Sequence, residues 1–236
     1  MLGLRHLGCV SIVAIALLAA APASAQSFSE EFEDITTLSG DGWAFDNNST
    51  SIGSTSWAPS TVEMSPRGAG EFQGNDTVFP AYSGAATGYI GTNYNATTGA
   101  STISDWLLTP AVTIQNGDTV SFWTRTTTGS SFPDRLQLRM SLNGTSTNCG
   151  TGPEDVGDFT TLLLDVNPTL TVGGYPEVWT QYTATIAGVA VPTQGRFAFR
   201  YYVTNGGPSG SASNYIGVDL FEYGAVPVEL QSFDVE

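Results

Sequence analysis

The sequence contains no lysine, one histidine and two cysteines. His6 and Cys9 both lie within the first 25 residues, which are predicted below to be an export signal. Without an imidazole base, neither a Ser-His-Asp triad nor a Cys-His pair can be assembled in the remaining chain. Zinc sites usually need His and Cys, while Schiff-base chemistry and Gly-Lys-Ser/Thr phosphate loops need lysine. The remaining Cys149 cannot form an internal disulfide. We expect it to be a spectator thiol in a loop, and a reactive thiol or a disulfide between chains are the alternatives.

Positive charge is also scarce. All seven basic residues are arginines, and Arg5 falls within the export signal. After cleavage, six arginines face 22 acidic residues, a formal charge of −16. Such a surface repels nucleic acid and anionic lipid, and it favours solubility and divalent cations. We therefore expect no nucleic-acid partner.

The first 25 residues have the features of a signal peptide. Arg5 and His6 give a cationic start, residues 10–20 form an apolar run, and residues 23–25 are the small Ala-Ser-Ala of a cleavage site. The run is shorter than the roughly 20 apolar residues that cross a bilayer. We predict a mature chain that begins at Gln26, has no transmembrane segment, and is secreted, extracellular or held at the cell surface.

Several segments have the pattern of β-strands. Two-residue alternation, or a content rich in Thr, Tyr and Trp, marks the segments 119–124, 136–142, 179–186, 197–203 and 215–223. Turn signals such as Asn143-Gly144 end them. Gly, Ser and Thr are abundant, and no window has a capped helical stripe. These features predict an all-β protein with one antiparallel β-sandwich domain.

Residues 60–99 are less regular and are expected to form long loops around one or two short strands. Loops on a rigid sandwich are common binding sites. Four aromatic residues, Trp57, Tyr82, Tyr89 and Tyr94, are candidates for stacking on a sugar or a protein partner. The alternative, that these rings cover the edges of the core, stays open.

An ordered set of motifs resembles a known family. Residues 105–110, Asp-Trp-Leu-Leu-Thr-Pro, are followed by Ile114 and by Val-Ser-Phe-Trp at 120–123. Further matches occur in order at 31–33, 42–57, 136–141, Trp179, 196–201 and 215–219. This set resembles the choice-of-anchor J and cleaved-adhesin domains, the jelly-roll sandwiches of gingipain haemagglutinin/adhesin modules and, more distantly, MAM domains. The resemblance implies a jelly-roll-like domain over 26–224, with 225–236 a C-terminal tail or the start of an anchor segment.

The same resemblance implies a bacterial surface protein that binds a glycan or a surface protein in cell adhesion, without catalysis. It also implies a structural Ca²⁺ where the first and last strands meet, held by Glu31 or Glu33 with Asp219. From the residues alone, the acceptor-rich loop 46–50 is a second candidate, with Asp46 and Asn48 as ligands, because Ca²⁺ prefers several carboxylate and carbonyl oxygens.

Two other functions remain. Residues 217–222 are similar to the Glu-x-Asp-x-x-Glu catalytic strand of laminarinase-like glycoside hydrolases, but Gly217 occupies the position of the nucleophile and two carboxylates are required. The chain could also be a purely structural envelope domain. The sequence does not identify the ligand.

Overall fold

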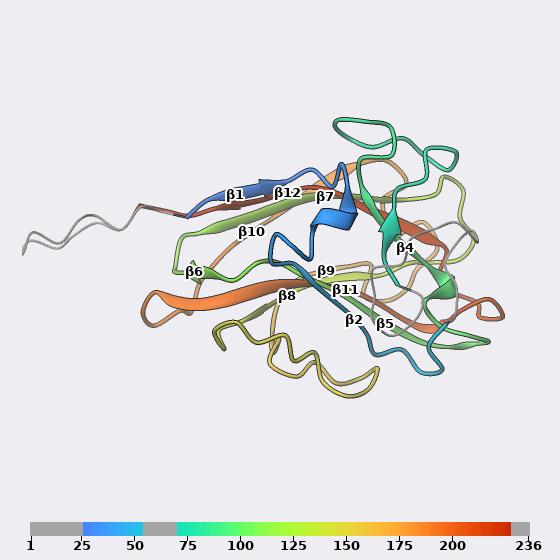
Figure 1. Cartoon of the computed structure of the whole chain (residues 1–236). Helices are drawn as coiled ribbons and strands as arrows, with labels where there is room; N and C mark the ends of the chain where they lie inside the picture. Colours follow the sequence, from blue (N-terminus) through green and yellow to red (C-terminus); the bar gives the residue numbers. More distant parts are fainter. Residues whose placement is uncertain (1–25, 54–69, 228–236) are drawn as a thin grey trace, which may run out of the picture. The chain divides into compact units, whose positions relative to one another are not determined.

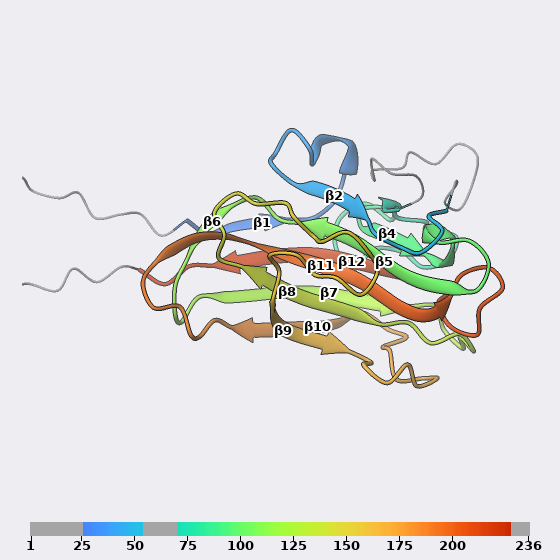
Figure 2. The same cartoon turned by 90° about the horizontal axis from the view of Figure 1, so that it is seen from below.

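Two antiparallel sheets face each other in the computed structural model, which describes residues 26–53 and 70–227 (Figures 1 and 2). The predicted signal peptide, Trp57 and residues 228–236 of the predicted tail lie outside these residues. Sheet I contains, in spatial order, β10 (Thr180–Thr185), β7 (Thr119–Thr126), β12 (Tyr215–Gly224), β4 (Ile90–Asn93) and β3 (Phe72–Gln73). The first strand, β1 (Phe28–Glu30), pairs with the last, β12.

Sheet II contains, in order, β2 (Ala44–Asn47), β5 (Ser101–Leu108), β11 (Thr193–Gly206), β8 (Leu136–Ser141) and β9 (Thr161–Val166). A short strand, β6 (Val112–Ile114), pairs with the start of β11. Within residues 26–53 and 70–227, helix is limited to two three-residue 3-10 turns, η1 (Ile35–Thr37) and η2 (Tyr94–Ala96), and neither has the length to span a bilayer. The predicted all-β, jelly-roll-like antiparallel sandwich is confirmed.

All five predicted strand segments correspond to strands, namely β7, β8, β10, β11 and β12. The described part of the irregular segment contains two short strands, β3 and β4, as expected. Two details differ. The family resemblance placed the first strand at 31–33, whereas β1 ends at Glu30. The alternation in β8 predicted one buried face, but Gln137 and Ser141 on its other face are only 2% exposed, because a loop covers that side.

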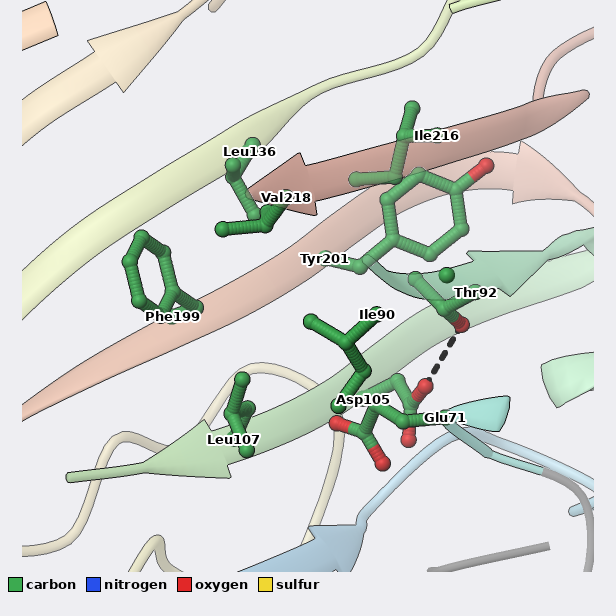
Figure 3. Close-up of a pocket in the computed structure, with 11 residues that line it drawn as sticks. Glu71, Ile90, Thr92, Asp105, Leu107, Leu136, Phe199, Tyr201, Ile216 and Val218 are labelled. Carbon is green, nitrogen blue, oxygen red and sulfur yellow. Dashed lines mark hydrogen bonds between the residues drawn. The ribbon is translucent and has the colours of Figure 1, made fainter. Parts of the chain in front are cut away.

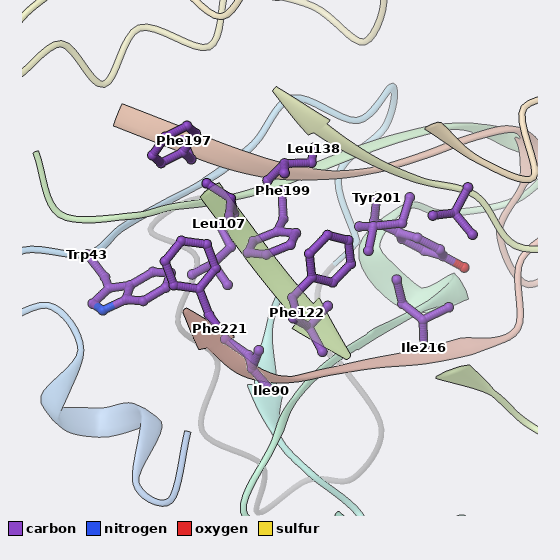
Figure 4. Packing of buried hydrophobic residues seen from close by; sticks show 14 of the residues in the cluster. Trp43, Ile90, Leu107, Phe122, Leu138, Phe197, Phe199, Tyr201, Ile216 and Phe221 are labelled. Atoms are coloured by element: carbon purple, nitrogen blue, oxygen red, sulfur yellow. The ribbon is translucent and has the colours of Figure 1, made fainter. Parts of the chain in front are cut away.

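The core lies between the inner faces of the two sheets (Figure 4). Phe122 of β7 meets Phe199 of β11 edge to face, with ring centroids 4.8 Å apart. Phe199 also contacts Phe221 of β12 at 5.8 Å. Each of these rings is at most 2% exposed, and burial of one such side chain stabilises the fold by about 1.5–3 kcal/mol. These contacts hold the sheets together and fix which side of each strand faces outward.

A loop covers part of the outer face of each sheet. Over sheet II, the 142–160 loop packs Cys149 and Phe159 against Trp106 of β5. Over sheet I, the 74–88 segment packs Phe79 against Tyr89 and Tyr215. Part of the outer face of sheet I beside this second cover carries exposed side chains.

Candidate functional site

Two aromatic rings are stacked on the outer face of sheet I. Trp123 alternates with the fully buried Phe122 along β7, so its half-buried side chain points outward. Tyr82, from the 74–88 segment, lies on it with ring centroids 3.7 Å apart and an interplanar angle of 14°. Tyr82 is 43% exposed. The stack is an aromatic platform that solvent reaches.

A buried carboxylate holds the backbone beneath Tyr82. Asp219 of β12 lies directly opposite Trp123 in the strand register and is 0% exposed. Its Oδ2 accepts hydrogen bonds from the backbone N–H groups of Tyr82 at 2.8 Å and Ser83 at 3.1 Å, and its Oδ1 accepts from Leu220 N–H at 2.7 Å. The pKa of Asp219 is raised to about 6, chiefly by burial and to a smaller extent by the negative charge of Glu31, while the three backbone hydrogen bonds oppose the rise. Two of these hydrogen bonds therefore fix the backbone that carries Tyr82, and the third orients the carboxylate on β12.

A second acid fixes the same segment a few residues later. Glu33 Oε1 accepts a hydrogen bond from Ala85 N–H at 2.9 Å. Gly84 has a φ of +72°, and a Cβ there would lie 1.5 Å from Glu33 Oε1. Only glycine suits this position, because it tolerates the left-handed backbone and leaves room for the carboxylate.

A polar hollow lies on the same outer face. Its volume is about 480 Å³, and its lining is Ser27, Phe28, Ser29, Thr119, Ser121, Glu222, Tyr223 and Gly224. Ser121 precedes Trp123 by two residues in β7 and so shares its face. Ser121 Oγ donates a hydrogen bond to Glu222 Oε2 at 3.1 Å. The site thus combines aromatic rings, hydroxyl groups and one carboxylate.

The other predicted aromatic positions have different surroundings. Tyr89 is 0% exposed, and its hydroxyl donates to the carbonyls of Asn75 at 2.9 Å and Phe79 at 3.1 Å. The prediction that Tyr89 is an exposed ligand residue is therefore wrong, since the ring is part of the core edge. Tyr94 is half-buried at a separate groove near η2. The prediction for Trp57 falls outside the described residues.

The five predicted calcium ligands do not form one centre. Glu31 follows β1 and its charge acts on Asp219, so these two lie where the first and last strands pair. Asp46, in contrast, is in β2 of sheet II, and Asn48 Nδ2 donates to the carbonyls of Cys149 and Gly150, both at 3.3 Å. No group of three or more acidic, His or Cys side chains with metal-site geometry occurs in the described residues.

The geometry at Gly217 bears on the hydrolase alternative. A Cβ at this position would lie 2.8 Å from the ring of Tyr89 and 2.9 Å from that of Trp179. A glutamate nucleophile would therefore not fit there without repacking the cover. Asp219, two residues on, is buried and bonded to three backbone N–H groups. The strand lacks both the space and the exposed acid pair that the hydrolase mechanism needs.

A small cavity lies between the sheets (Figure 3). Its volume is about 20 Å³, which is room for about one water molecule. The carboxylates of Glu71 and Asp105 lie together at one end, and Thr92 Oγ1 donates to Asp105 Oδ2 at 2.6 Å. This cavity is too small for a sugar or a peptide side chain, so it is not the candidate ligand site.

The sequence reasoning missed Trp123 as a site residue. It fell within a predicted strand, and its alternation with Phe122 was the signal that could have placed it on the outer face. Phe132, which is 47% exposed beside the groove near η2, was also missed. It lies in a loop without periodicity, so no sequence pattern identifies it.

No protein-family model and no curated protein matches the sequence. Among solved structures, the K2 cleaved adhesin domain of Lys-gingipain is similar with a TM-score of 0.51 and 17% identity, covering 84% of this chain and 99% of that domain. The K1 cleaved adhesin domain of Lys-gingipain from Porphyromonas gingivalis W83 has a TM-score of 0.49 and 20% identity, covering 85% and 99%. The CBM22-1 xylan-binding domain from Paenibacillus barcinonensis Xyn10C has a TM-score of 0.43 and 15% identity, covering 89% and 100%. At such identities the likeness to the K2 domain shows a shared β-sandwich fold, and membership of the choice-of-anchor J family stays a prediction.

Proposed function

We propose that the chain is an exported, non-catalytic binding module of the adhesion type that recognises a glycan on the outer face of sheet I. The observation that carries this proposal is the exposed stack of Tyr82 on Trp123 beside the polar hollow. An aromatic ring offers a flat apolar face to the C–H groups of a sugar, while neighbouring hydroxyl and carboxylate groups orient the sugar hydroxyls. The similarity of fold to a domain named an adhesin supports the same class.

The lining of the site favours an uncharged ligand. Glu222 is the charged side chain of the hollow, and no basic residue lines it among the described residues. The whole chain is also strongly acidic. Sulfated or phosphorylated glycans would be repelled by such a surface, so neutral polysaccharides are the favoured ligands.

The test is binding of the mature chain to a panel of neutral and acidic polysaccharides by calorimetry. Tyr82→Ala should weaken binding of a neutral ligand by about tenfold or more, because the variant removes the accessible half of the platform. Trp123→Ala should weaken it further. Val178→Ala is the matched control, since its exposed side chain precedes β10 on the same sheet and lies outside the site. Binding that both aromatic variants retain would overturn the outer-face site, and the absence of any glycan ligand would favour a protein partner or a purely structural envelope domain.

We further propose that Ca²⁺ stabilises the domain through Glu31 and Asp219. Two carboxylates at the junction of β1 and β12 raise each other's energy when both are charged, and a divalent cation would relieve this repulsion. The three N–H donors already on Asp219 leave it fewer lone pairs for a metal, so the exposed Glu31 and backbone carbonyls would supply most of the ligand oxygens.

Thermal unfolding with Ca²⁺ and with a chelator tests this. A ligand at a hundredfold excess over its Kd stabilises the folded state by about 2.7 kcal/mol, so the midpoint should rise with Ca²⁺ in the wild type and not in Glu31→Gln. Asp46→Asn locates the site, because it should keep the rise if β1 and β12 hold the metal and lose it if the 46–50 loop does. No rise in the wild type would overturn the calcium proposal.

A further inference from the structure

The turn that joins β11 to β12 lies at one end of the sandwich (Figure 1). Residues of this turn line a second hollow. Its volume is about 410 Å³, within the range of small-molecule sites. Tyr94 comes from η2, Phe132 from the loop between β7 and β8, and Pro208, Ser213 and Asn214 from the turn before β12. The platform residues Tyr82 and Trp123 do not line this groove, so it is a separate site.

Asn214 forms hydrogen bonds to the segments on either side of it around the groove. Its Nδ2 donates hydrogen bonds to Thr127 Oγ1 and Ser130 Oγ, both at 2.9 Å. Its backbone carbonyl accepts from Tyr94 N–H at 3.0 Å, which fixes the η2 wall. Because both amide hydrogens are used, the group that Asn214 can offer to a ligand is its Oδ1 acceptor.

Phe132 is exposed although its backbone is held. Ser130 Oγ donates to Phe132 O at 2.8 Å and accepts from Phe132 N–H at 3.2 Å, and the same Ser130 Oγ accepts from Asn214. The ring is nevertheless 47% exposed. The exposed part of this ring makes no packing contacts within the fold, whereas it gains contact area when a ligand covers it.

The turn before β12, which forms one wall of the groove, contains two glycines that residues with a side chain cannot replace. Gly207 has a φ of +96°, and a Cβ at Gly210 would lie 2.2 Å from Asn205 O. The turn therefore needs glycine at both positions, and the groove between Tyr94 and Phe132 stays open. Its two rings face a space that contains amide, hydroxyl and backbone groups.

The groove has no charged lining residue among the described residues. The neighbouring Asp134 is 0% exposed, and its oxygens accept from Thr126 Oγ1 and Tyr201 OH, both at 2.6 Å, and from Asn214 N–H at 2.7 Å. An ionic ligand would find no counter-charge here. Aromatic faces beside uncharged acceptors and donors match a neutral sugar ring, which has apolar C–H faces and hydroxyl edges.

We infer that this groove is a second binding site, specific for a neutral pyranose, and that the domain is therefore bivalent for neutral glycans. The inference shares the glycan ligand of the proposed function but rests on a different set of residues. Two sites on one chain allow it to cross-link polysaccharide strands, and avidity would strengthen its attachment to a repeating glycan surface.

The test titrates the mature chain with neutral oligosaccharides and follows both stoichiometry and amide chemical shifts. The wild type should bind two sugars per chain, with shifts at the Asn214 side-chain amide and at the backbone amides of Ser130 and Phe132. Phe132→Ala should remove these shifts, weaken the groove site by about tenfold or more, and leave the platform site intact. Tyr82→Ala should weaken the platform site and leave the groove site and its shifts intact. Val172→Ala, a loop position 59% exposed, is the surface control.

The outcomes separate the two proposals. The groove is not a sugar site if Phe132→Ala still binds two sugars with wild-type affinity. The same conclusion follows if the wild type binds one sugar and Tyr82→Ala abolishes that binding. In both cases the proposed function survives. If Phe132→Ala abolishes all binding and Tyr82→Ala none, the groove site stands and the platform fails. Groove shifts caused by proline-rich peptides and by no saccharide would overturn the inference. A cross-linking assay adds a second readout, since the wild type should precipitate a long neutral polysaccharide and either single-site variant should not.

Discussion

At the scale of single residues, Asp219 balances two opposing effects. Its burial disfavours the charged carboxylate, whereas its three backbone hydrogen bonds favour it. Burial has the larger effect, so the pKa of Asp219 lies at about 6, above its ordinary 3.8. The same carboxylate that fixes the platform therefore carries a cost in stability when it is charged.

This raised pKa predicts a pH dependence of stability. The folded protein holds the Asp219 proton more tightly than the unfolded chain, so this group's contribution is largest below about pH 4 and is lost as pH rises through about 6. The loss is at most about 3 kcal/mol, and solvent screening reduces it. In Asp219→Asn the contribution is absent.

The measurement is urea unfolding from pH 4 to pH 7, with a chelator present so that bound metal does not contribute. The difference in unfolding free energy between wild type and Asp219→Asn should shrink as the pH rises. A difference that stays constant over this range would show that Asp219 titrates below pH 4 in the folded state. Carboxylates that do not interact with Asp219 titrate alike in both proteins, so the comparison cancels their contributions.

Gly217 gives a second prediction at this scale. Its missing side chain makes room for the rings of Tyr89 and Trp179, which would lie within 3 Å of an added Cβ. Gly217→Ala should therefore lower the unfolding free energy by about 1–3 kcal/mol, the usual cost of overpacking. Gly152→Ala is the control, because nothing lies within 4 Å of a Cβ there and its backbone is not left-handed. Equal stability of both variants would show that the aromatic cover moves easily.

Among the tyrosines, the sequence predicted the candidate group but not the exposure of each member. Tyr82 and Tyr89 both lie in the irregular segment, and local pattern does not separate them. Tyr89 is buried because its ring packs against Tyr215, 126 residues away, whose hydroxyl donates to Tyr89 OH at 2.8 Å. Such long-range contacts are not visible in local periodicity. Trp123, by contrast, was accessible to prediction from its alternation with Phe122.

At the scale of elements, the strands that were predicted are those whose residue types show alternation or a content rich in Thr, Tyr and Trp, and the number of covered faces did not decide it. β7 has clean alternation, with every second residue buried. In β5, by contrast, the last six residues are all buried, because the 142–160 loop covers the outer face of sheet II. Because Ser104 and Asp105 lie among these buried residues, β5 has neither a two-residue alternation nor a continuous apolar run. The strand pattern therefore did not mark β5, whereas the family resemblance included part of it.

The 142–160 loop gives a prediction that is specific to one element. The thiol of Cys149 is 1% exposed, in the small cluster formed by this loop and Trp106. In a chain that begins at Gln26 it is the only cysteine. A thiol reagent should therefore label the native protein slowly and the unfolded protein at once, and the native rate should report opening of the loop.

Trp106→Phe should speed the labelling, because the smaller ring leaves a gap beneath the loop. Val191→Ala, at an exposed position outside this cluster, should not change the rate. Fast labelling of the native wild type would contradict the buried position of Cys149.

At the scale of the whole molecule, the dominant feature is one-sided charge. Six arginines face 22 acidic residues in the predicted mature chain, and several of the arginines are engaged internally. Arg200, for example, is 2% exposed and lies over the rings of Trp106 and Tyr202, while Arg135 pairs with Asp165 at 2.6 Å. Five acidic side chains are buried among the described residues as well, namely Glu71, Asp105, Asp118, Asp134 and Asp219. The remaining acidic residues still far outnumber the remaining arginines, so the surface stays strongly negative.

This imbalance predicts a salt effect on stability. Repulsion among surface carboxylates destabilises the compact state, and salt screens it, with a Debye length of about 30 Å at 0.01 M and 8 Å at 0.15 M. The Tm at pH 7 should therefore rise between 10 and 150 mM NaCl in the presence of a chelator. A gain of about 1 kcal/mol would raise the Tm by about 2–4 °C in a chain of this size.

Choline chloride at equal ionic strength should give the same rise if screening is the cause, whereas a specific effect of Na⁺ would be lost. Sucrose at equal osmolality does not screen charge, so it should not give the same change in Tm as the two salts. A Tm that is flat or falls with NaCl would show that the carboxylates are already neutralised by contacts within the fold. Because neutral glycans bring no counter-charge, their binding should depend far less on salt than the stability of the domain does.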